Sequence, residues 1–574
     1  MTSPALTALS TTDRNTTIDT PSAADQLNDV PHLSRRWWHL DPGGALGGLG
    51  LAVLSVTPSL LPRPALFQGV VTAVAFALGY LLGVAVWRAA RSLVRRRPAP
   101  ALRRVLWITY AAIWLAAVAV LSVLALSWQN EVRALVEMPP LGGADLAPFL
   151  AGFVPVALLL LAIGKANRRL FLALRRTSGS SMAILGTATV VVAGTAGVAL
   201  AAVVAVDTIY AGLNAGPEAG LAEPDSTYRS AGPDSAIDWE DLGRHGSAFV
   251  GGGPTADEIA ALIDAPAMQP IRVYAGLASA DTVEERAQLV VSELERTGAF
   301  DREVLVIATT TGSGWLEAQT VDSIEYLHAG DTAIAALQYA YTPSWVSFLF
   351  DPDAPVEAAR VLFDAVEERW LQLPVADRPQ LISYGLSLGA HGSQAVFDDL
   401  DAVRARTDGA MFVGSPAGST LWQSLQDARD PGSPVWRPVL DEGREVRWMS
   451  RDGDQGLLDG HWEHPRVLYL QHATDPVTWL TPELLWRAPE WLDQGQRGDD
   501  VSPSMRWIPV VTAVQVGIDM LGGEAVPARH GHNFGDVVTS GWREVTGDAG
   551  LDEEAVAAIR TEIESYAPIQ PFQE

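Results

Sequence analysis

The feature that most constrains this 574-residue chain is a series of apolar stretches in its first third. Five of them approach the length of a bilayer-crossing helix, which needs about 20 predominantly apolar residues. The first contains Pro58 and several glycines, which a membrane helix tolerates better than a soluble one. We therefore expect an all-α transmembrane region of about five helices within residues 35–207. The expected helices are residues 43–62, 66–87, 105–127, 147–164 and 183–206.

Charge is divided unevenly between this region and the rest of the chain. Residues 1–207 carry 17 Lys and Arg against 9 Asp and Glu, whereas the remainder carries 23 against 58, which gives the net charge of −27. A basic apolar part followed by an acidic part favours a membrane part and a water-exposed part. Nucleic acid is not an expected partner of the acidic part, because phosphate binding needs a basic surface. The chain has no cysteine, which excludes disulfides, thiolate metal ligands and a cysteine nucleophile.

The placement of arginine predicts the orientation of the chain in a membrane. Residues 88–104 and 165–176, which follow the second and fourth stretches, are rich in arginine, and Arg35 and Arg36 precede the first. Basic loops stay on the cytoplasmic side. We therefore expect a multi-pass plasma-membrane protein with a cytoplasmic N-terminus and everything after about residue 208 outside the cytoplasm. Residues 1–34, rich in Thr, Ser, Ala and Asp, are expected to form a disordered cytoplasmic tail.

The remaining chain has the alternating strand and helix patterns of an α/β domain. Residues 208–256 are rich in Gly, Pro, Ala and Asp, which predicts a linker with local structure. In residues 257–574, short β-rich runs alternate with helical patterns, which favours a mostly parallel sheet with helices on both faces. The expected strands are 271–274, 304–307, 333–339, 381–384, 410–413 and 466–470, and the expected helices lie near 282–297, 355–372, 389–405 and 553–566.

The pentapeptide Gly385-Leu386-Ser387-Leu388-Gly389 lies between an expected strand and an expected helix. Strand, tight turn with flanking glycines and helix is the context of a nucleophile elbow, in which a strained turn exposes a serine hydroxyl. The pattern alone is weak, because short motifs of common residues also arise by chance. Gly385 and Gly389 are the expected elbow glycines, and Ser387 is the candidate nucleophile.

A serine nucleophile needs a base, and the base needs an orienting carboxylate. Asp475 follows the strand expected at residues 466–470, and His532 lies in a Gly-rich loop before the last helix. The order Ser387, Asp475, His532 is the order of α/β-hydrolases. His530 is the alternative base, and His532 is preferred because Gly-His-x-aromatic is the usual setting of the base in that fold.

An oxyanion hole needs two donors, one of which comes from the residue after the nucleophile. Leu388 would supply that backbone N–H. The loop Thr309–Trp315 follows an expected strand, and the N–H groups of Thr311 and Gly312 are the candidates for the second donor. The alternative is that this Gly-rich turn serves packing alone.

Seven strings in this sequence together resemble the actinobacterial membrane-anchored α/β-hydrolase family. The resemblance covers nearly the whole chain beyond the tail, and Ser313 stands where relatives are expected to have Thr. It implies an α/β-hydrolase fold with a serine nucleophile on a membrane anchor, and it implies no particular substrate. The strings are Thr57–Arg63, Thr309–Trp315, Gln338–Trp345, Gly385–Gly389, Val413–Pro416, His472–Pro476 and His530–Phe534.

These observations predict a membrane-anchored serine hydrolase for a carboxylic ester of a lipid or of the cell envelope, with no metal or organic cofactor required. The expected partners are a lipid or small-molecule ester and the bilayer. An acyltransferase with the same triad and a non-catalytic lipid- or partner-binding module are the alternatives. His461 and His464 have no third ligand nearby, so a surface loop is favoured over a metal site. The Trp-rich segment Val477–Leu492 is either a lid near the bilayer or ordinary cap packing.

Overall fold

The computed structural model describes residues 41–93, 100–458 and 460–566, so the predicted tail at residues 1–34, together with Arg35 and Arg36, lies outside the described residues. Its centre is a seven-stranded sheet in which every pair of neighbouring strands is parallel. The order is β1-β3-β2-β4-β5-β7-β6. The strands are β1 Ile271–Ala275, β2 Val304–Thr309, β3 Thr332–Leu337, β4 Gln380–Leu386, β5 Gly409–Val413, β6 Val446–Met449 and β7 Arg466–Leu470.

All six strands expected from the sequence are present in this sheet. Nearly all strand residues are buried, as expected for a parallel sheet covered on both faces, whose strands are near-continuous apolar runs. The edge strand β6 is the one that the sequence analysis missed. It has only four residues and includes Arg447, so it lacks the apolar run that marks the others.

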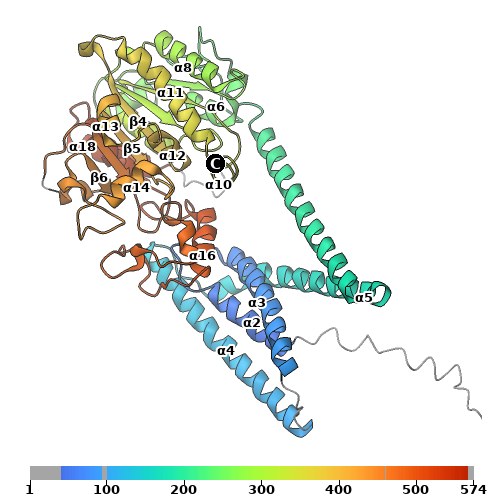
Figure 1. The fold of residues 1–574 in the computed structure, drawn as a ribbon. Helices are drawn as coiled ribbons and strands as arrows, with labels where there is room; N and C mark the ends of the chain where they lie inside the picture. Colours follow the sequence, from blue (N-terminus) through green and yellow to red (C-terminus); the bar gives the residue numbers. More distant parts are fainter. Residues whose placement is uncertain (1–40, 94–99, 459, 567–574) are drawn as a thin grey trace, which may run out of the picture.

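Helices cover both faces of the sheet (Figure 1). On one face, α8 packs on β1 and β3, α11 on β2 and β3, and α12 on β2 and β4. On the other, α6 packs on β1, α9 on β3, and α17 on β5 and β7. The expected helix at 389–405 is two helices, α12 and α13. The helices of this part are α6 Gly243–Gly251, α7 Ala256–Ile263, α8 Val283–Thr297, α9 Ala318–Leu327, α10 Ser344–Phe350, α11 Ala354–Leu371, α12 Leu388–Gln394, α13 Leu400–Arg406, α14 Thr420–Asp427, α15 Pro476–Trp479, α16 Val511–Asp519, α17 Val537–Thr546 and α18 Glu553–Glu564.

The N-terminal part consists of long apolar helices. In the described part of the chain, three are long and apolar enough to cross a membrane, at Ala65–Ser92, Arg104–Leu135 and Gly143–Leu213, whereas five were expected. They correspond to α3 Ala65–Leu93, α4 Pro100–Leu135 and, with the short turn η2 Gly143–Asp145, to α5 Leu146–Leu213.

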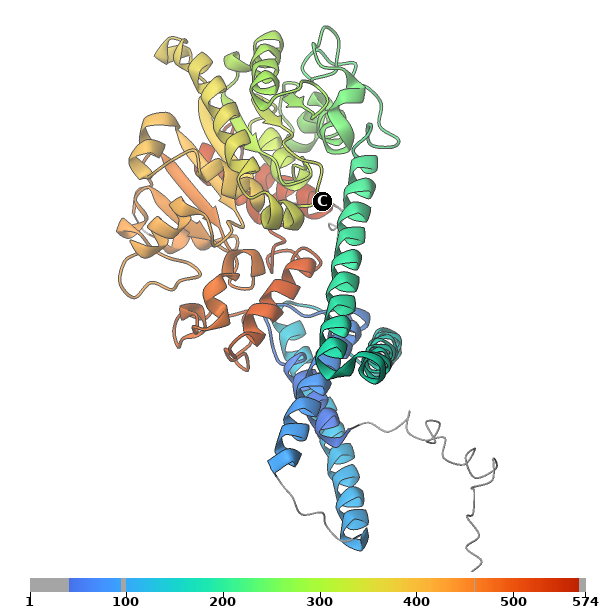
Figure 2. The same ribbon diagram turned by 45° about the vertical axis from the view of Figure 1, so that its right-hand side comes forward.

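The count differs from five for two reasons. The first expected helix, 43–62, is only α2 Pro42–Leu54, because Pro58 and Pro62 cannot continue a helix and residues 55–64 leave it. The fourth and fifth, 147–164 and 183–206, lie in the two helical arms that together form α5. Gly179 interrupts α5 with a non-helical conformation, φ 80° and ψ 173°, and Figures 1 and 2 show two arms that meet at a sharp bend.

Residues 208–256 were expected to form a linker with local structure, and parts of this segment pack onto the α/β part. Ala231, Ile237, Leu242 and Phe249 are buried in the hydrophobic core of the sheet, and α6 lies against β1. Arg229 also forms an isolated parallel bridge with Arg272 of β1. The segment therefore has local structure and contacts β1 and the core.

The segment between α2 and α3, residues 55–64, touches the α/β part. Figures 1 and 2 both place α16 between the sheet and the N-terminal helices. Gln515 of α16 donates hydrogen bonds to the backbone oxygens of Leu54 and Thr57, and Ser59 donates one to the carboxylate of Asp519. The N-terminal part is therefore in direct contact with the helix that precedes the candidate site.

Candidate active site

Ser387 lies at a sharp turn between β4 and α12. Its φ of 57° and ψ of −123° are unusual for a residue with a side chain, as the strained turn of a nucleophile elbow requires. The Ser387 N–H donates to the carbonyl oxygen of Val413 over 2.8 Å, which fixes the turn against β5. The structure therefore has the strand–turn–helix arrangement that the pentapeptide predicts.

The two elbow glycines allow close backbone contacts. A Cβ at Gly385 would lie 2.6 Å from the backbone nitrogen of Ala390, so α12 could not fold back tightly on β4. A Cβ at Gly389 would lie 3.0 Å from the carbonyl oxygen of Thr310, at the end of β2. Glycine at both positions brings the elbow against the end of β2.

Asp475 and His532 form a buried hydrogen-bonded pair. Asp475 follows β7 and caps α15, where its Oδ1 accepts from the Val477 N–H over 2.8 Å. Its Oδ2 lies 2.7 Å from Nδ1 of His532. Asp475 is fully buried and His532 is 4 % exposed. A carboxylate at Nδ1 holds the imidazole in the tautomer whose Nε2 can accept a proton.

Backbone contacts fix the position of the His532 ring. The His532 N–H donates to the carbonyl oxygen of Gly523 over 2.8 Å. Gly414 follows β5 with a φ of 56°, and a Cβ there would lie 2.7 Å from Nδ1 of His532. Only glycine at position 414 therefore leaves room for the imidazole.

His530, the alternative base, has a different carboxylate partner. Its Nδ1 lies 3.2 Å from Oδ2 of Asp500, which also accepts from the Thr474 hydroxyl over 2.9 Å. Burial alone would raise the pKa of Asp500, but the hydrogen bond with His530 and the neighbouring His472 and Thr474 outweigh it, and the pKa is lowered. Thr474 also accepts from the Gly531 N–H over 3.0 Å, so Asp500 is linked through Thr474 to the loop that carries both histidines.

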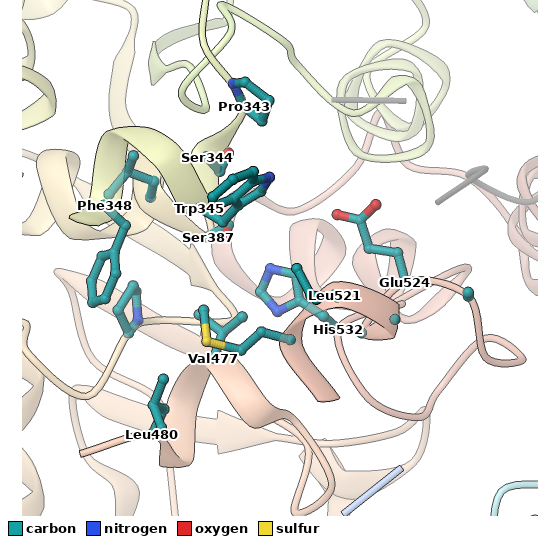
Figure 3. Close-up of a pocket in the computed structure, with 16 residues that line it drawn as sticks. Pro343, Ser344, Trp345, Phe348, Ser387, Val477, Leu480, Leu521, Glu524 and His532 are labelled. Carbon is teal, nitrogen blue, oxygen red and sulfur yellow. The ribbon is translucent and has the colours of Figure 1, made fainter. Parts of the chain in front are cut away.

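Ser387 and His532 line the same cavity, whereas His530 is not among its lining residues. The cavity has a volume of about 90 Å³. Figure 3 shows Trp345 and Phe348 of α10 on one side, Val477 and Leu480 on another, and the His532 ring near the centre. The walls are mainly apolar, and they come from α10, from the segment after β7 and from residues 520–525.

The Trp-rich segment Val477–Leu492 contributes to both the pocket and the core. Val477 and Leu480 line the pocket, while Trp479 and Trp491 are buried with their ring centroids 6.1 Å apart. Trp486 is 63 % exposed. Two tryptophans of the segment are therefore packed in the core, and its first residues form a wall of the pocket.

The expected oxyanion donors are only partly in place. Leu388 lines the pocket, and as the first residue of α12 its N–H has no partner within the helix. The Thr311 N–H donates to the carbonyl oxygen of Trp315 over 3.0 Å, and the Gly312 N–H donates to the Ser344 hydroxyl oxygen over 3.2 Å. Both N–H groups of the loop are thus engaged, and neither Thr311 nor Gly312 lines the pocket.

Metal ligands do not gather in the part of the chain that the structure describes. No group of three or more His, Cys, Asp or Glu side chains there is arranged to hold a metal ion. His464, one of the two histidines in the loop before β7, lies with its Nδ1 3.3 Å from the carbonyl oxygen of Asp408.

A parallel sheet, a serine elbow after its central strand, and an Asp–His pair from later loops define the α/β-hydrolase fold. The chain belongs to an alpha/beta-hydrolase family, whose model matches residues 271–559. A second model, for the N-terminus of the same family, matches residues 56–254. No curated protein matches this sequence.

Proposed function

We propose that this protein is a serine hydrolase that cleaves carboxylic esters with Ser387 as nucleophile, His532 as base and Asp475 as the carboxylate that orients the base. The observation that carries the proposal is the buried 2.7 Å contact between Asp475 and His532, because His532 and Ser387 line the same pocket. The strained elbow at Ser387 supports it, since strain at a residue with a side chain is typical of functional sites.

In this mechanism, the Ser387 oxygen attacks the ester carbonyl carbon while its proton moves to Nε2 of His532. The negative charge on the carbonyl oxygen is held by hydrogen-bond donors that include the Leu388 N–H. Collapse of this tetrahedral intermediate expels the alcohol, which takes the proton from Nε2. Water then attacks the acyl–serine ester, gives a proton to Nε2, and the acid leaves as the proton returns to Ser387.

The substrate class follows from location and from the pocket. Apolar walls and a volume of about 90 Å³ suit the first carbons of an acyl chain better than a whole drug-sized ligand, which needs at least about 300 Å³. Among residues 41–93, 100–458 and 460–566, three helices are long and apolar enough to cross a membrane. A lipid or cell-envelope ester is therefore the substrate that we propose.

A fluorophosphonate probe tests the chemistry on the full-length protein in detergent. The wild type should be labelled at Ser387, and Ser387→Ala should be unlabelled and inactive on esters. Ser393→Ala is the matched control, because Ser393 lies in α12, is also buried, and donates its hydroxyl to the Ala390 carbonyl oxygen of the same helix. An intact wild type that stays unlabelled would rule out the proposed mechanism. An added alcohol that diverts the acyl group from water during turnover would instead indicate an acyltransferase.

We further propose that the α/β part lies outside the cytoplasm, on the basis of the arginine distribution. The two arms of α5, on either side of Gly179, are each longer than the about 20 residues that one crossing requires. An alkaline phosphatase reporter fused after residue 210 should be active, and one fused near residue 97 should be inactive. The reverse pattern would place the hydrolase in the cytoplasm.

A further inference from the structure

Ser344 and Glu524 are polar residues that line the pocket and that the mechanism above does not use, and Ser344 is the one that carries a hydroxyl. It begins α10, is 8 % exposed, and lines the pocket together with Ser387 and Leu388. The loop Thr309–Trp315, which was expected to supply a backbone donor, packs against Ser344. A Cβ at Gly312 would lie 2.7 Å from Cα of Ser344 and 2.8 Å from its backbone nitrogen, so glycine lets the loop pack closely against Ser344.

The hydrogen bonding of Ser344 leaves its proton available. The hydroxyl oxygen accepts from the Gly312 N–H over 3.2 Å, which occupies one lone pair. A serine hydroxyl has one O–H donor in addition to its two acceptor sites. Among the residues that the structure describes, none accepts a hydrogen bond from this O–H. An N–H bonded to the oxygen also polarises the hydroxyl and strengthens it as a donor.

The loop also connects Ser344 to the elbow. Gly389 of the elbow lies against the carbonyl oxygen of Thr310, and Gly312, two residues further, lies against Ser344. The end of β2 therefore touches the nucleophile turn on one side and the start of α10 on the other. This arrangement fixes the distance between Ser344 and Ser387 through backbone contacts rather than through flexible side chains.

We propose that the Ser344 hydroxyl is the second donor of the oxyanion hole, acting with the Leu388 N–H and held in place by the Gly312 N–H. The inference rests on the proposed serine hydrolase activity. It replaces the direct backbone donation expected from Thr311 or Gly312, whose N–H groups are already engaged. The negative oxygen of the tetrahedral intermediate accepts from Ser344 without any proton leaving the serine.

Three variants of the full-length protein test this role in ester hydrolysis. Ser344→Ala should lower kcat by about 10²–10³-fold with little change in KM, because an oxyanion donor acts in the transition state. Ser344→Thr keeps a hydroxyl and should retain activity within about tenfold of wild type. Ser347→Ala is the control for damage to α10, because Ser347 is buried in the same helix but bonds to Thr342.

A transition-state analogue separates catalysis from structure. An alkylboronic acid forms a tetrahedral adduct on the serine, so Ser344→Ala should weaken its binding by about the same factor as kcat, whereas Ser347→Ala should not. Ser344→Ala with wild-type kcat and wild-type boronate affinity would overturn the inference. If Ser387 is still labelled by the fluorophosphonate, that outcome leaves the proposed function intact, whereas an unlabelled wild type removes both.

A structure of the wild-type protein with a phosphonate adduct on Ser387 gives a test that does not depend on a variant. The phosphoryl oxygen should lie about 3 Å from the Ser344 oxygen and from the Leu388 nitrogen. A separation of more than about 4 Å from the Ser344 oxygen would contradict the assignment.

Discussion

The carboxylate of Asp519 lies 2.7 Å from the guanidinium of Arg63, and this buried ion pair joins the α/β part to the N-terminal part of the chain. Ser59 and the Leu61 N–H also donate to Asp519. Directly after Asp519, residues 520–523 line the pocket, and the carbonyl oxygen of Gly523 accepts from the His532 N–H. The segment between α2 and α3 is therefore linked to the candidate base through Asp519 and the adjoining residues 520–523.

This contact predicts that Arg63 is needed for both stability and activity. Arg63→Ala would leave the Asp519 carboxylate buried without its cation, which costs about 3–5 kcal/mol. The melting temperature in detergent and the rate of ester turnover should both decrease. The double variant Arg63→Met, Asp519→Leu should recover part of the stability, because it removes both charges. Arg444→Ala is the control, since its pair with Asp441 is exposed and is worth at most about 1 kcal/mol. Equal losses from Arg63→Ala and Arg444→Ala would contradict the prediction.

The two histidines of the loop should behave differently. His532→Gln removes the ring that is bonded to Asp475, and it should lower kcat by at least about 10³-fold and slow fluorophosphonate labelling of Ser387. His530→Gln breaks only the contact with Asp500 and should retain most of the activity, with a modest loss of thermal stability. Initial rates and labelling time courses for both variants provide the measurement. A larger loss of kcat in His530→Gln would reverse the assignment of the base.

Substitution of Gly414 should lower the rate of ester hydrolysis strongly, although glycine has no side chain that could take part in catalysis. In Gly414→Ala, the new Cβ would overlap the His532 ring, and the positive φ at this position would be strained as well. Displacement of the base by about 1 Å costs about 10²-fold in rate, so kcat should decrease by at least that factor. Gly418→Ala, four residues along the same loop, has no atom within 4 Å of the new Cβ and should be close to wild type. An active Gly414→Ala protein would mean that the ring is not held where the structure places it.

The sequence predicted the parts of this fold that depend on local pattern. Buried strands appear as runs of β-rich apolar residues, and the elbow appears as glycines around Ser387 at the end of one such run. The chain order of Asp475 and His532 then pointed to two loops that meet at the carboxyl edge of the sheet. Their hydrogen bond in the structure agrees with that reading.

The features that the sequence did not predict depend on contacts between distant segments. Residues 55–62 are apolar enough to be counted with a membrane helix, yet their prolines end the helix and Ser59 bonds to Asp519 instead. The loop at Thr311 and Gly312 has the glycines of an oxyanion loop, but the bonds that engage both N–H groups depend on a turn and on Ser344. Neither relationship leaves a periodic signal in the chain.

Acid should destabilise the α/β part through His245 of α6. Burial of its imidazole, with the charge of Arg244 nearby, lowers the pKa of His245 to about 4. The unfolded chain takes up this proton near pH 6.5, but the folded chain does not until about pH 4, so the free energy of unfolding decreases as pH falls through that window. The loss is at most about 3 kcal/mol. His245→Gln should show a shallower decrease in melting temperature between pH 7 and pH 4.5 than the wild type. Parallel curves for the two proteins would show that this histidine does not contribute.

The contact between α2 and α3 predicts one further sensitive position. Gly79 of α3 lies against Gly47 of α2 so closely that a Cβ would be 2.8 Å from the Gly47 carbonyl carbon. Small residues at a helix crossing let two backbones approach, and this close packing favours helix association in lipid. Gly79→Val should therefore separate α2 from α3, displace residues 55–63 from Asp519, and lower both melting temperature and ester turnover. Gly50→Val, on α2 but with no atom within 4 Å of its Cβ, is the matched control and should have a small effect. If Gly79→Val lowers the melting temperature but leaves turnover unchanged, α2 supports the fold without supporting the pocket wall at residues 520–523.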